Sequence, residues 1–490
     1  MKLMIVGSGY VGLVAGACFS ELGHDVVCVD RDAGKIERLQ AGIVPIFEPG
    51  LEELMLANTA IGRLTFANDL SGLNNGVDAV FIAVGTPASS IDQSADLSMV
   101  FAVARDVARA ASSDLVIVTK STVPVGTGDE IARIMRATAP KLRFCVASNP
   151  EFLREGNAIK DFMAPDRIVI GVEDDPARVA LERVYGPLTE RGRPLVSTSR
   201  RAAELVKYAS NCFLATKISF INELADLCEA VGTDIQEVAG GMGLDRRIGS
   251  TFLQAGPGYG GSCFPKDCDA MLATAKTNRV TLSVVSSAVA ANEARKDAIA
   301  SRVIRALDCG TEGNVVAVLG LTFKADTDDV RQTPAFPLIH ALKQAGISVR
   351  VFDPQGMVHA RRILTDVEFC LSASEACAGA DCAVITTEWQ EFRTLDAKTL
   401  ARAMRGQRIV DLRNLLDREK FVREGFVVHS VGRPTRLPDR AAAGLRDGGS
   451  PPASADWEDV SLAFSSNAES GDDVVARGRA FSSGAYGAAP

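Results

Sequence analysis

The chain has 490 residues, a formal net charge of −8 and a hydrophobic fraction of 47%. This length and composition allow two or three domains with full cores. The acidic balance argues against a general nucleic-acid-binding protein, which needs a basic face. Eleven cysteines show no paired spacing, and only four histidines are present. The sequence therefore predicts no metal site and no disulfide framework, and free thiols in this number are typical of a reducing cytosol.

The first six residues could pass for a short apolar signal segment. Glycines at positions 7 and 9 interrupt it, and no run of 18 apolar residues follows. We interpret it as a buried strand and expect a soluble, cytoplasmic protein with no membrane segment.

A strand, a glycine-rich turn and a helix open the chain. Apolar residues 3–6 precede Gly-Ser-Gly-Tyr-Val-Gly at 7–12, and a second apolar run, 26–29, ends in Asp30. In this context the glycines let a pyrophosphate approach the helix N-terminus, and the acid binds ribose hydroxyls. The pattern predicts a dinucleotide site.

The charges near this motif bear on the choice of cofactor. The Asp30 carboxylate favours NAD over NADP because it repels a 2′-phosphate, although Arg31 follows it directly. Lys35 fits either a cofactor contact or a solvated lysine.

Further strand-like runs separated by helical segments continue this pattern. They predict a doubly wound α/β domain over residues 1–196. The runs are Ala79–Val84, Leu115–Thr119, Phe144–Ala147 and Arg167–Val172.

A long helix is predicted from 199 to 231, ended by Gly232, and another covers 283–307. Extending the apolar stripe of the first helix backwards from Leu214 reaches Asn211 and Lys207. A buried lysine is costly unless it is paired or has a function. The alternative is a helix end that emerges into water.

The α/β pattern returns at 315–319, where Gly320 begins a turn that lacks the GxGxxG motif. Strands at 349–352, 383–386 and 408–410 follow, the first ending in Asp353. We therefore expect two Rossmann-like doubly wound domains joined by a long central helix and a helical connector domain. The expected domains are 1–196, 197–300, 301–438 and a disordered tail, 439–490; a short docking helix near 457–464 is the alternative for the tail.

Polar residues follow several strands, where ligands bind in open α/β sheets. Thr86 and Thr122 each lie just after an apolar strand, although ordinary turn chemistry explains them equally well. Asn149 and Pro150 read as an N-cap and first helical residue, which would place Glu151 and Glu155 on one helix face.

Residues 252–267 carry the strongest chemical signal. Glycine and proline crowd around Cys263, a composition that suits a backbone closing tightly around a small ligand. Cys263 is a candidate nucleophile, with Lys266 and Asp267 as acid–base groups. The alternative, for any lone cysteine, is a buried inert thiol. Farther on, Lys324 and Arg331 suit phosphate contact or a solvated basic loop.

These motifs, in this order, resemble the UDP-glucose/GDP-mannose dehydrogenase family over residues 1 to about 436. The segments that carry the resemblance are 7–12, 149–155, Lys207 with Asn211, 252–267 and 320–324. Ser262 and Phe264 match the members that oxidise UDP-glucose; the other members usually differ at one of these two positions.

The resemblance implies a four-electron oxidation of UDP-glucose to UDP-glucuronate with two NAD, in nucleotide-sugar supply for polysaccharide biosynthesis. Cys263 would carry a thiohemiacetal and then a thioester, which water hydrolyses. It also implies a homodimer through the central helix. Alternatives are oxidation of another nucleotide sugar, of GDP-mannose or UDP-N-acetyl-hexosamine type, or a catalytically silent nucleotide-sugar-binding scaffold.

The resemblance assigns roles residue by residue. Those implied in catalysis are Cys263, Lys207, Asn211, Asp267, Thr122 and Glu151. Those implied in NAD binding are Gly7, Gly9, Val11, Gly12, Asp30, Lys35, Thr86, Thr122, Glu155, Lys266 and Arg331. Those implied in substrate binding are Glu151, Phe152, Leu153, Arg154, Glu155, Lys207, Asn211, Phe252, Leu253, Gln254, Ala255, Gly256, Gly260 and Lys324.

Overall fold

The computed structural model describes residues 1–89, 94–307 and 313–438. They form two compact units. The N-terminal unit contains Met1–Phe213, Lys266–Leu282 and Asp326–Asp328; the C-terminal unit contains Leu214–Pro265, Ser283–Ala325 and the described residues from Asp329 onward. The expected tail lies outside the described residues, and the three expected domain boundaries stay a prediction.

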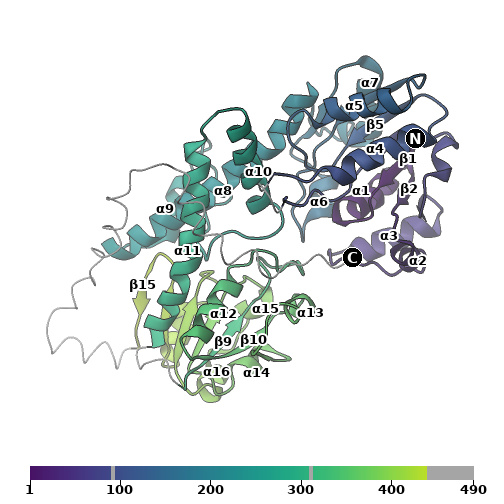
Figure 1. The fold of residues 1–490 in the computed structure, drawn as a ribbon. Coiled ribbons are helices and arrows are strands. Elements are labelled where there is room, and N and C mark those ends of the chain that lie inside the picture. The colour runs from purple at the N-terminus through teal and green to yellow at the C-terminus, as the bar shows by residue number, and fades with distance from the viewer. Residues whose placement is uncertain (90–93, 308–312, 439–490) are drawn as a thin grey trace. The chain divides into compact units, whose positions relative to one another are not determined.

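The N-terminal unit is built on an eight-stranded sheet with the order β3-β2-β1-β4-β5-β6-β7-β8. Figure 1 labels its strands β1, β2 and β5. Neighbouring strands are parallel except β6 and β7, which meet antiparallel at Ser148 and Gly171. The strands are β1 (Lys2–Val6), β2 (Asp25–Val29), β3 (Leu64–Ala67), β4 (Ala79–Ile82), β5 (Leu115–Thr119), β6 (Phe144–Ser148), β7 (Ile168–Gly171) and β8 (Leu195–Thr198).

Helices cover both faces of this sheet, so its central strands are buried on both sides. Leu3 and Ile5 of β1 pack into one core, and Met4 and Val6 into another. This two-sided burial explains why the strand is a continuous apolar run. The helices are α1 (Tyr10–Glu21), α2 (Ala33–Gln40), α3 (Leu51–Ala60), the 3₁₀ turn η1 (Ser71–Asn74), α4 (Ser98–Ala110), α5 (Thr127–Thr138), α6 (Ala158–Met163) and α7 (Asp175–Thr189).

The C-terminal unit has a seven-stranded sheet with the order β11-β10-β9-β12-β13-β14-β15, parallel except for the β14–β15 pair. The strands are β9 (Val315–Leu319), β10 (Ser348–Phe352), β11 (Glu368–Phe369), β12 (Cys382–Ile385), β13 (Arg408–Asp411), β14 (Val427–Ser430) and β15 (Arg433–Arg436). Its helices after β9 are α12 (Ala335–Gln344), α13 (Met357–Ala360), α14 (Ala373–Cys377), α15 (Gln390–Arg393), α16 (Ala397–Ala403) and α17 (Arg418–Arg423).

Four helices make up the helical region predicted, in sequence, after the strands of the first sheet and before those of the second. They are α8 (Arg200–Val231), α9 (Ile235–Gly243), α10 (Phe264–Thr277) and α11 (Ser283–Leu307). The predicted long helix is confirmed to within one residue, and 283–307 is confirmed as α11. The expected fold class is confirmed. No helix in the described part of the chain is long and apolar enough to span a membrane.

Glu204 of α8 fixes the start of α5. The N-cap of α5 is Gly126, which has no side chain to accept the first backbone amides. The Glu204 carboxylate takes that role, accepting hydrogen bonds from Gly126 N at 2.7 Å and Gly128 N at 2.8 Å, and from Ser148 Oγ at 3.2 Å. A carboxylate at a helix N-terminus is also favoured by the helix dipole.

We expect Glu204→Ala to destabilise this corner by about 2–3 kcal/mol, because buried donors lose their acceptor. Hydrogen exchange at the first-turn amides of α5 should accelerate accordingly. The exposed Glu37 of α2 provides a matched control, and Glu37→Ala should leave those rates unchanged. Equal protection of α5 in Glu204→Ala and wild type would contradict the capping role.

Candidate active site

The glycine motif at the start of α1 has the geometry of a phosphate site. Gly7 has φ +109°, and a Cβ on Gly12 would lie 1.8 Å from Gly7 O, so both positions need glycine. A Cβ on Gly9 would meet nothing within 4 Å. Gly9 is the N-cap of α1 and gives no side-chain cap, and the first turn holds no acidic residue. The open N-terminus of α1 therefore fits the pyrophosphate of a dinucleotide.

Asp30 follows β2 and contacts this turn. Its carboxylate accepts hydrogen bonds from Ser8 N at 2.9 Å, Asp32 N at 3.1 Å and Lys35 Nζ at 2.9 Å. Burial would raise the pKa of the Asp30 carboxyl, but these hydrogen bonds outweigh it and hold the pKa below its usual range. The carboxylate thus stays ionised, as recognition of ribose hydroxyls requires. Lys35 is the partner of Asp30 and not a solvated lysine.

The two predicted threonines meet at the carboxyl edge of the sheet. Thr86 Oγ1 donates to the carbonyl oxygen of Thr122 at 2.9 Å, so the turns after β4 and β5 are joined. Ser121 Oγ adds a bond to Val84 O at 2.7 Å. Both predicted residues therefore lie at the strand ends, where ligands of open α/β sheets bind.

The helix predicted from Pro150 is wrong. Residues 149–157 are irregular, and α6 begins only at Ala158. Acceptors from elsewhere hold the backbone amides instead: Glu48 accepts from Gly156 N and Ala158 N, and Asp161 accepts from Arg154 N. Glu151 and Glu155 therefore share no helix face.

Two polar pairs link α8 to its neighbours in the N-terminal unit. Lys207, 3% exposed, forms an ion pair with Glu151 Oε1 at 3.1 Å. One turn further, Asn211 Nδ2 donates to Asp267 Oδ2 at 2.6 Å, and Lys266 Nζ contacts the other carboxylate oxygen at 2.8 Å. The expectation that the helical repeat buries Lys207 and Asn211 is confirmed.

The remaining polar and aromatic residues of the turn at 151–155 lie close by in the same unit. The Phe152 ring faces Lys207 Nζ at 5.5 Å and stacks on the Arg167 guanidinium at 3.7 Å. Arg154 pairs with Asp161 at 2.7 Å, and Glu155 accepts from Thr327 Oγ1 at 3.0 Å.

Residues 252–263, here called the cysteine loop, belong to the C-terminal unit, and Cys263 directly precedes α10. Cys263 is part-exposed, with Ser262 Oγ at 3.6 Å from its Sγ. A Cβ on Gly260 would lie 2.3 Å from Gln332 O, and one on Gly261 would lie 2.7 Å from the Phe323 ring. The glycines are thus required because the loop passes directly against Phe323 and Gln332.

Three side chains that the sequence interpretation missed hold this loop. Asn292 accepts from Tyr259 N at 2.8 Å and donates to Tyr259 O at 3.2 Å. Asn222 accepts from Gly256 N at 2.8 Å, and Arg295 donates to Gly256 O at 2.6 Å. Asn292 carried a usable signal, because it lies among buried positions of α11 at helical spacing, as Lys207 does on α8.

The basic residues predicted after β9 lie near this loop in the C-terminal unit. Arg331 pairs with Asp329 at 2.8 Å, and its carbonyl accepts from Gly261 N at 2.9 Å. Lys324 is part-exposed beside the Phe323 ring.

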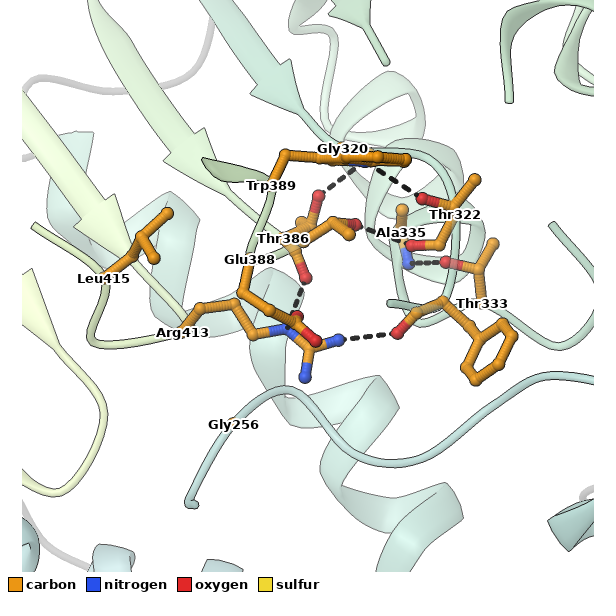
Figure 2. Close-up of polar contacts among 12 residues, drawn as sticks. Gly256, Gly320, Thr322, Thr333, Ala335, Thr386, Glu388, Trp389, Arg413 and Leu415 are labelled. Carbon is orange, nitrogen blue, oxygen red and sulfur yellow. Dashed lines mark hydrogen bonds and ion pairs between the residues drawn. The ribbon is translucent and has the colours of Figure 1, made fainter. Parts of the chain in front are cut away.

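Arg413, which the sequence interpretation also missed, follows β13. Its guanidinium donates to Thr386 O at 2.8 Å and Phe323 O at 2.7 Å and lies 3.0 Å from Glu388, as Figure 2 shows for Thr386 and Glu388. A cation two residues beyond a buried strand was the signal that could have identified it.

Side chains of the C-terminal unit itself bind the turn after β9. Asp353, which follows β10 as Asp30 follows β2, accepts from Leu321 N at 2.7 Å, Thr322 N at 3.0 Å and Trp389 Nε1 at 3.1 Å. Trp389 lies beside Thr322, to whose Oγ1 its Nε1 donates at 3.2 Å (Figure 2). Asp353 of the second sheet thus binds two backbone amides of the turn after β9 and an indole of the protein. The turn after β1, in contrast, has open space beside Gly9.

Three family models match successive parts of the chain. They describe the UDP-glucose/GDP-mannose dehydrogenase family: its NAD binding domain at residues 1–189, its central domain at 201–294 and its UDP binding domain at 317–418.

Similar proteins cover nearly the whole described chain. A UDP-glucose 6-dehydrogenase of Rhizobium meliloti is 53% identical over 436 residues, which are 89% of this chain and 100% of that protein. UDP-glucose 6-dehydrogenase TuaD of Bacillus subtilis is 42% identical, over 88% of this chain and 93% of that one. A solved UDP-glucose dehydrogenase from Pyrobaculum islandicum is 40% identical with a TM-score of 0.81, over 88% of this chain and 98% of that one.

Two glycines of the first turn should respond oppositely to substitution. We expect Gly9→Val to fold with a stability within about 0.5 kcal/mol of wild type, because its Cβ enters open space. It should weaken NAD binding at least about tenfold, because the side chain occupies the approach of the pyrophosphate. Gly12→Ala should cost about 3 kcal/mol or more, because its Cβ meets Gly7 O.

Thermal unfolding and NADH fluorescence titration would separate the two effects. Unchanged dinucleotide affinity in a folded Gly9→Val protein would show that the cofactor does not bind at this turn.

Proposed function

Because this chain belongs to the UDP-glucose/GDP-mannose dehydrogenase family, we propose that it is a UDP-glucose 6-dehydrogenase. The observation that carries the proposal is the 53% identity to a protein of that activity over the whole length of that protein. The part-exposed Cys263 in a glycine loop before α10 supports the covalent chemistry that this oxidation needs.

The overall reaction converts a primary alcohol, two NAD⁺ and one water into a carboxylate, two NADH and three protons. NAD, when bound, accepts the hydride in each of the two oxidations. Gly7, Gly9 and Gly12 with Asp30 fit this cofactor in the N-terminal unit, because they leave a helix N-terminus open and hold an ionised carboxylate beside it.

Cys263 is the proposed nucleophile. Its sulfur attacks the C6 aldehyde and forms a thiohemiacetal, which retains the half-oxidised substrate. The second oxidation leaves a thioester, and water displaces the sulfur to release the acid. The helix dipole of α10 favours negative charge at Cys263, directly before its first turn.

The polar pairs on α8 supply the charge and orientation that these steps need. Lys207 is a buried cation that can hold the oxygen as negative charge develops on it. Glu151, paired with it, can take or return the proton of that oxygen. Asn211 and Asp267, bonded at 2.6 Å, can hold and deprotonate the hydrolytic water.

We propose that the substrate is bound by residues 151–155, Lys207, Asn211, residues 252–256, Gly260 and Lys324. Arg413 adds a cation to the group in the C-terminal unit, since its guanidinium lies 3.4 Å from the position of a Cβ on Gly256. We also propose that the protein works in the cytoplasm.

We expect two NADH per UDP-glucose consumed, and near-complete loss of turnover in Cys263→Ser with UDP-glucose binding retained. The serine hydroxyl keeps the shape of the loop but is a far weaker nucleophile at neutral pH. NADH absorbance with a panel of UDP- and GDP-sugars measures both the stoichiometry and the substrate. One NADH per sugar with released aldehyde would exclude the covalent mechanism, and preference for another sugar would exclude UDP-glucose as the substrate.

We propose a homodimer formed through α8. Phe213, Phe220 and Leu227 recur every seven residues on this helix and are 67%, 46% and 55% exposed. Exposed apolar side chains in a row are typical of a protein interface.

The double variant Phe213→Glu, Phe220→Glu should therefore run as a monomer, because two carboxylates cannot be buried in an apolar interface. Light scattering after size exclusion would measure its mass. Leu371→Glu, at an 85% exposed leucine outside α8, is the control and should keep the wild-type mass. A dimeric double variant would place the interface elsewhere.

A further inference from the structure

Lys120 is a buried cation to which the proposed mechanism assigns no role. It follows β5 directly, two residues before Thr122, and is 3% exposed. Within the described residues, no carboxylate lies within ion-pair distance of its ammonium. A buried ammonium without a carboxylate partner costs stability, so its presence calls for a function.

The contacts of Lys120 tie it to the turn that carries Glu151. Its Nζ donates to Asn149 Oδ1 at 3.0 Å and lies 3.4 Å from Tyr185 Oη. Tyr185 donates to the same amide oxygen at 2.5 Å, and Asn149 Nδ2 donates to Val169 O at 2.8 Å. Asn149 is thereby fixed two residues before Glu151.

Lys120 and Glu151 both line a small cavity. The cavity has a volume of about 40 Å³, and its lining includes Lys120, Asn149, Glu151 and Tyr185. That volume holds a water, and these side chains offer enough polar partners for one. Lys120 and Glu151 therefore line one space that can hold a single water.

The charges of this buried cluster do not cancel. Lys120 and Lys207 are each 3% exposed and Glu151 is 7% exposed, so two cations accompany one carboxylate. Such a cluster favours an added negative charge, as on an oxygen losing its proton.

We propose that Lys120 is a positioning residue for the oxidation: it holds the turn that carries Glu151 and makes the Glu151–Lys207 cluster net positive. The inference rests on the proposed function, and it assigns Lys120 no contact with substrate.

The pKa of Lys120 makes this role measurable. Burial lowers the pKa from its ordinary 10.5 to about 8, with Glu151 raising it and Lys207 lowering it further. Above pH 8 the ammonium is lost and the cluster becomes neutral overall. The other titratable or charged groups that face Lys120 or line its cavity are Cys18 of α1, Asp161 of α6, Tyr185 of α7 and Arg167.

The experiment compares kcat of wild type and Lys120→Met from pH 6 to 10 with the preferred sugar. We expect the ratio of wild type to variant to be about 10- to 100-fold at pH 7 and to fall toward one above pH 9, where wild type has lost the same charge. Taking a ratio removes titrations that both proteins share. Lys120→Arg should restore activity at pH 7 and keep it at high pH, because a guanidinium stays charged.

Thermal unfolding distinguishes positioning from folding. Because the pKa of Lys120 is lowered to about 8, its ammonium destabilises the folded protein fully below that pH. The destabilisation decreases as the pH rises from about 8 toward 10.5. Lys120→Met should therefore be as stable as wild type at pH 7, or more so. Tyr185→Phe is the matched control, because it removes a hydrogen bond to Asn149 and no cation, and its ratio to wild type should not vary with pH.

The proposal would be overturned if the enzyme is active and the ratio of wild-type kcat to Lys120→Met kcat is constant from pH 6 to 10. So would a loss of activity that matches a loss of folded protein. An inactive wild type would instead refute the proposed function, so the two failures are distinguishable.

Discussion

The buried ion pair between Lys207 and Glu151 is the interaction on which the arrangement of the N-terminal unit depends. Burial of either charge alone would be costly, so the pairing favours one position of α8 against the irregular turn that follows β6. Asn211 extends the same constraint by one helical turn, since it bonds the buried Asp267. Polar groups that weaken a packed core thus define which face of α8 meets the rest of the unit.

The two sheets share a topology but use the same position differently. An aspartate follows the second strand of each, as Asp30 and Asp353. Asp30 binds one backbone amide of the glycine turn and a lysine, and leaves the helix N-terminus open beside Gly9. Asp353 binds two turn amides and the Trp389 indole, which closes the corresponding place. The fold alone therefore does not make a dinucleotide site; the side chains around the turn do.

The sequence predicted most strands because their burial is visible as contiguous apolar runs, and the long helices because their apolar residues recur at helical spacing. It failed at 149–157, where Glu48 and Asp161 hold backbone amides and no local propensity decides the outcome. It missed β8, whose middle residues are exposed and which has no apolar run. Among site residues, Lys207 was found because a helix has a repeat in which a polar residue can be out of place. Lys120 and Arg413 follow strands, where the chain turns and no helical repeat shows that a cation is out of place.

The cysteine loop shows why rigidity matters more here than the thiol alone. The two covalent intermediates proposed on the Cys263 sulfur would require that it keep its position through successive steps, and a loop rich in glycine is by itself flexible. Asn292 removes that freedom by pairing with both backbone groups of Tyr259, as a neighbouring strand would. Arg295 and Asn222 do the same at Gly256. Glycine thus permits the close approach to Phe323 and Gln332, and amide and guanidinium side chains from α8 and α11 supply the order that glycine cannot.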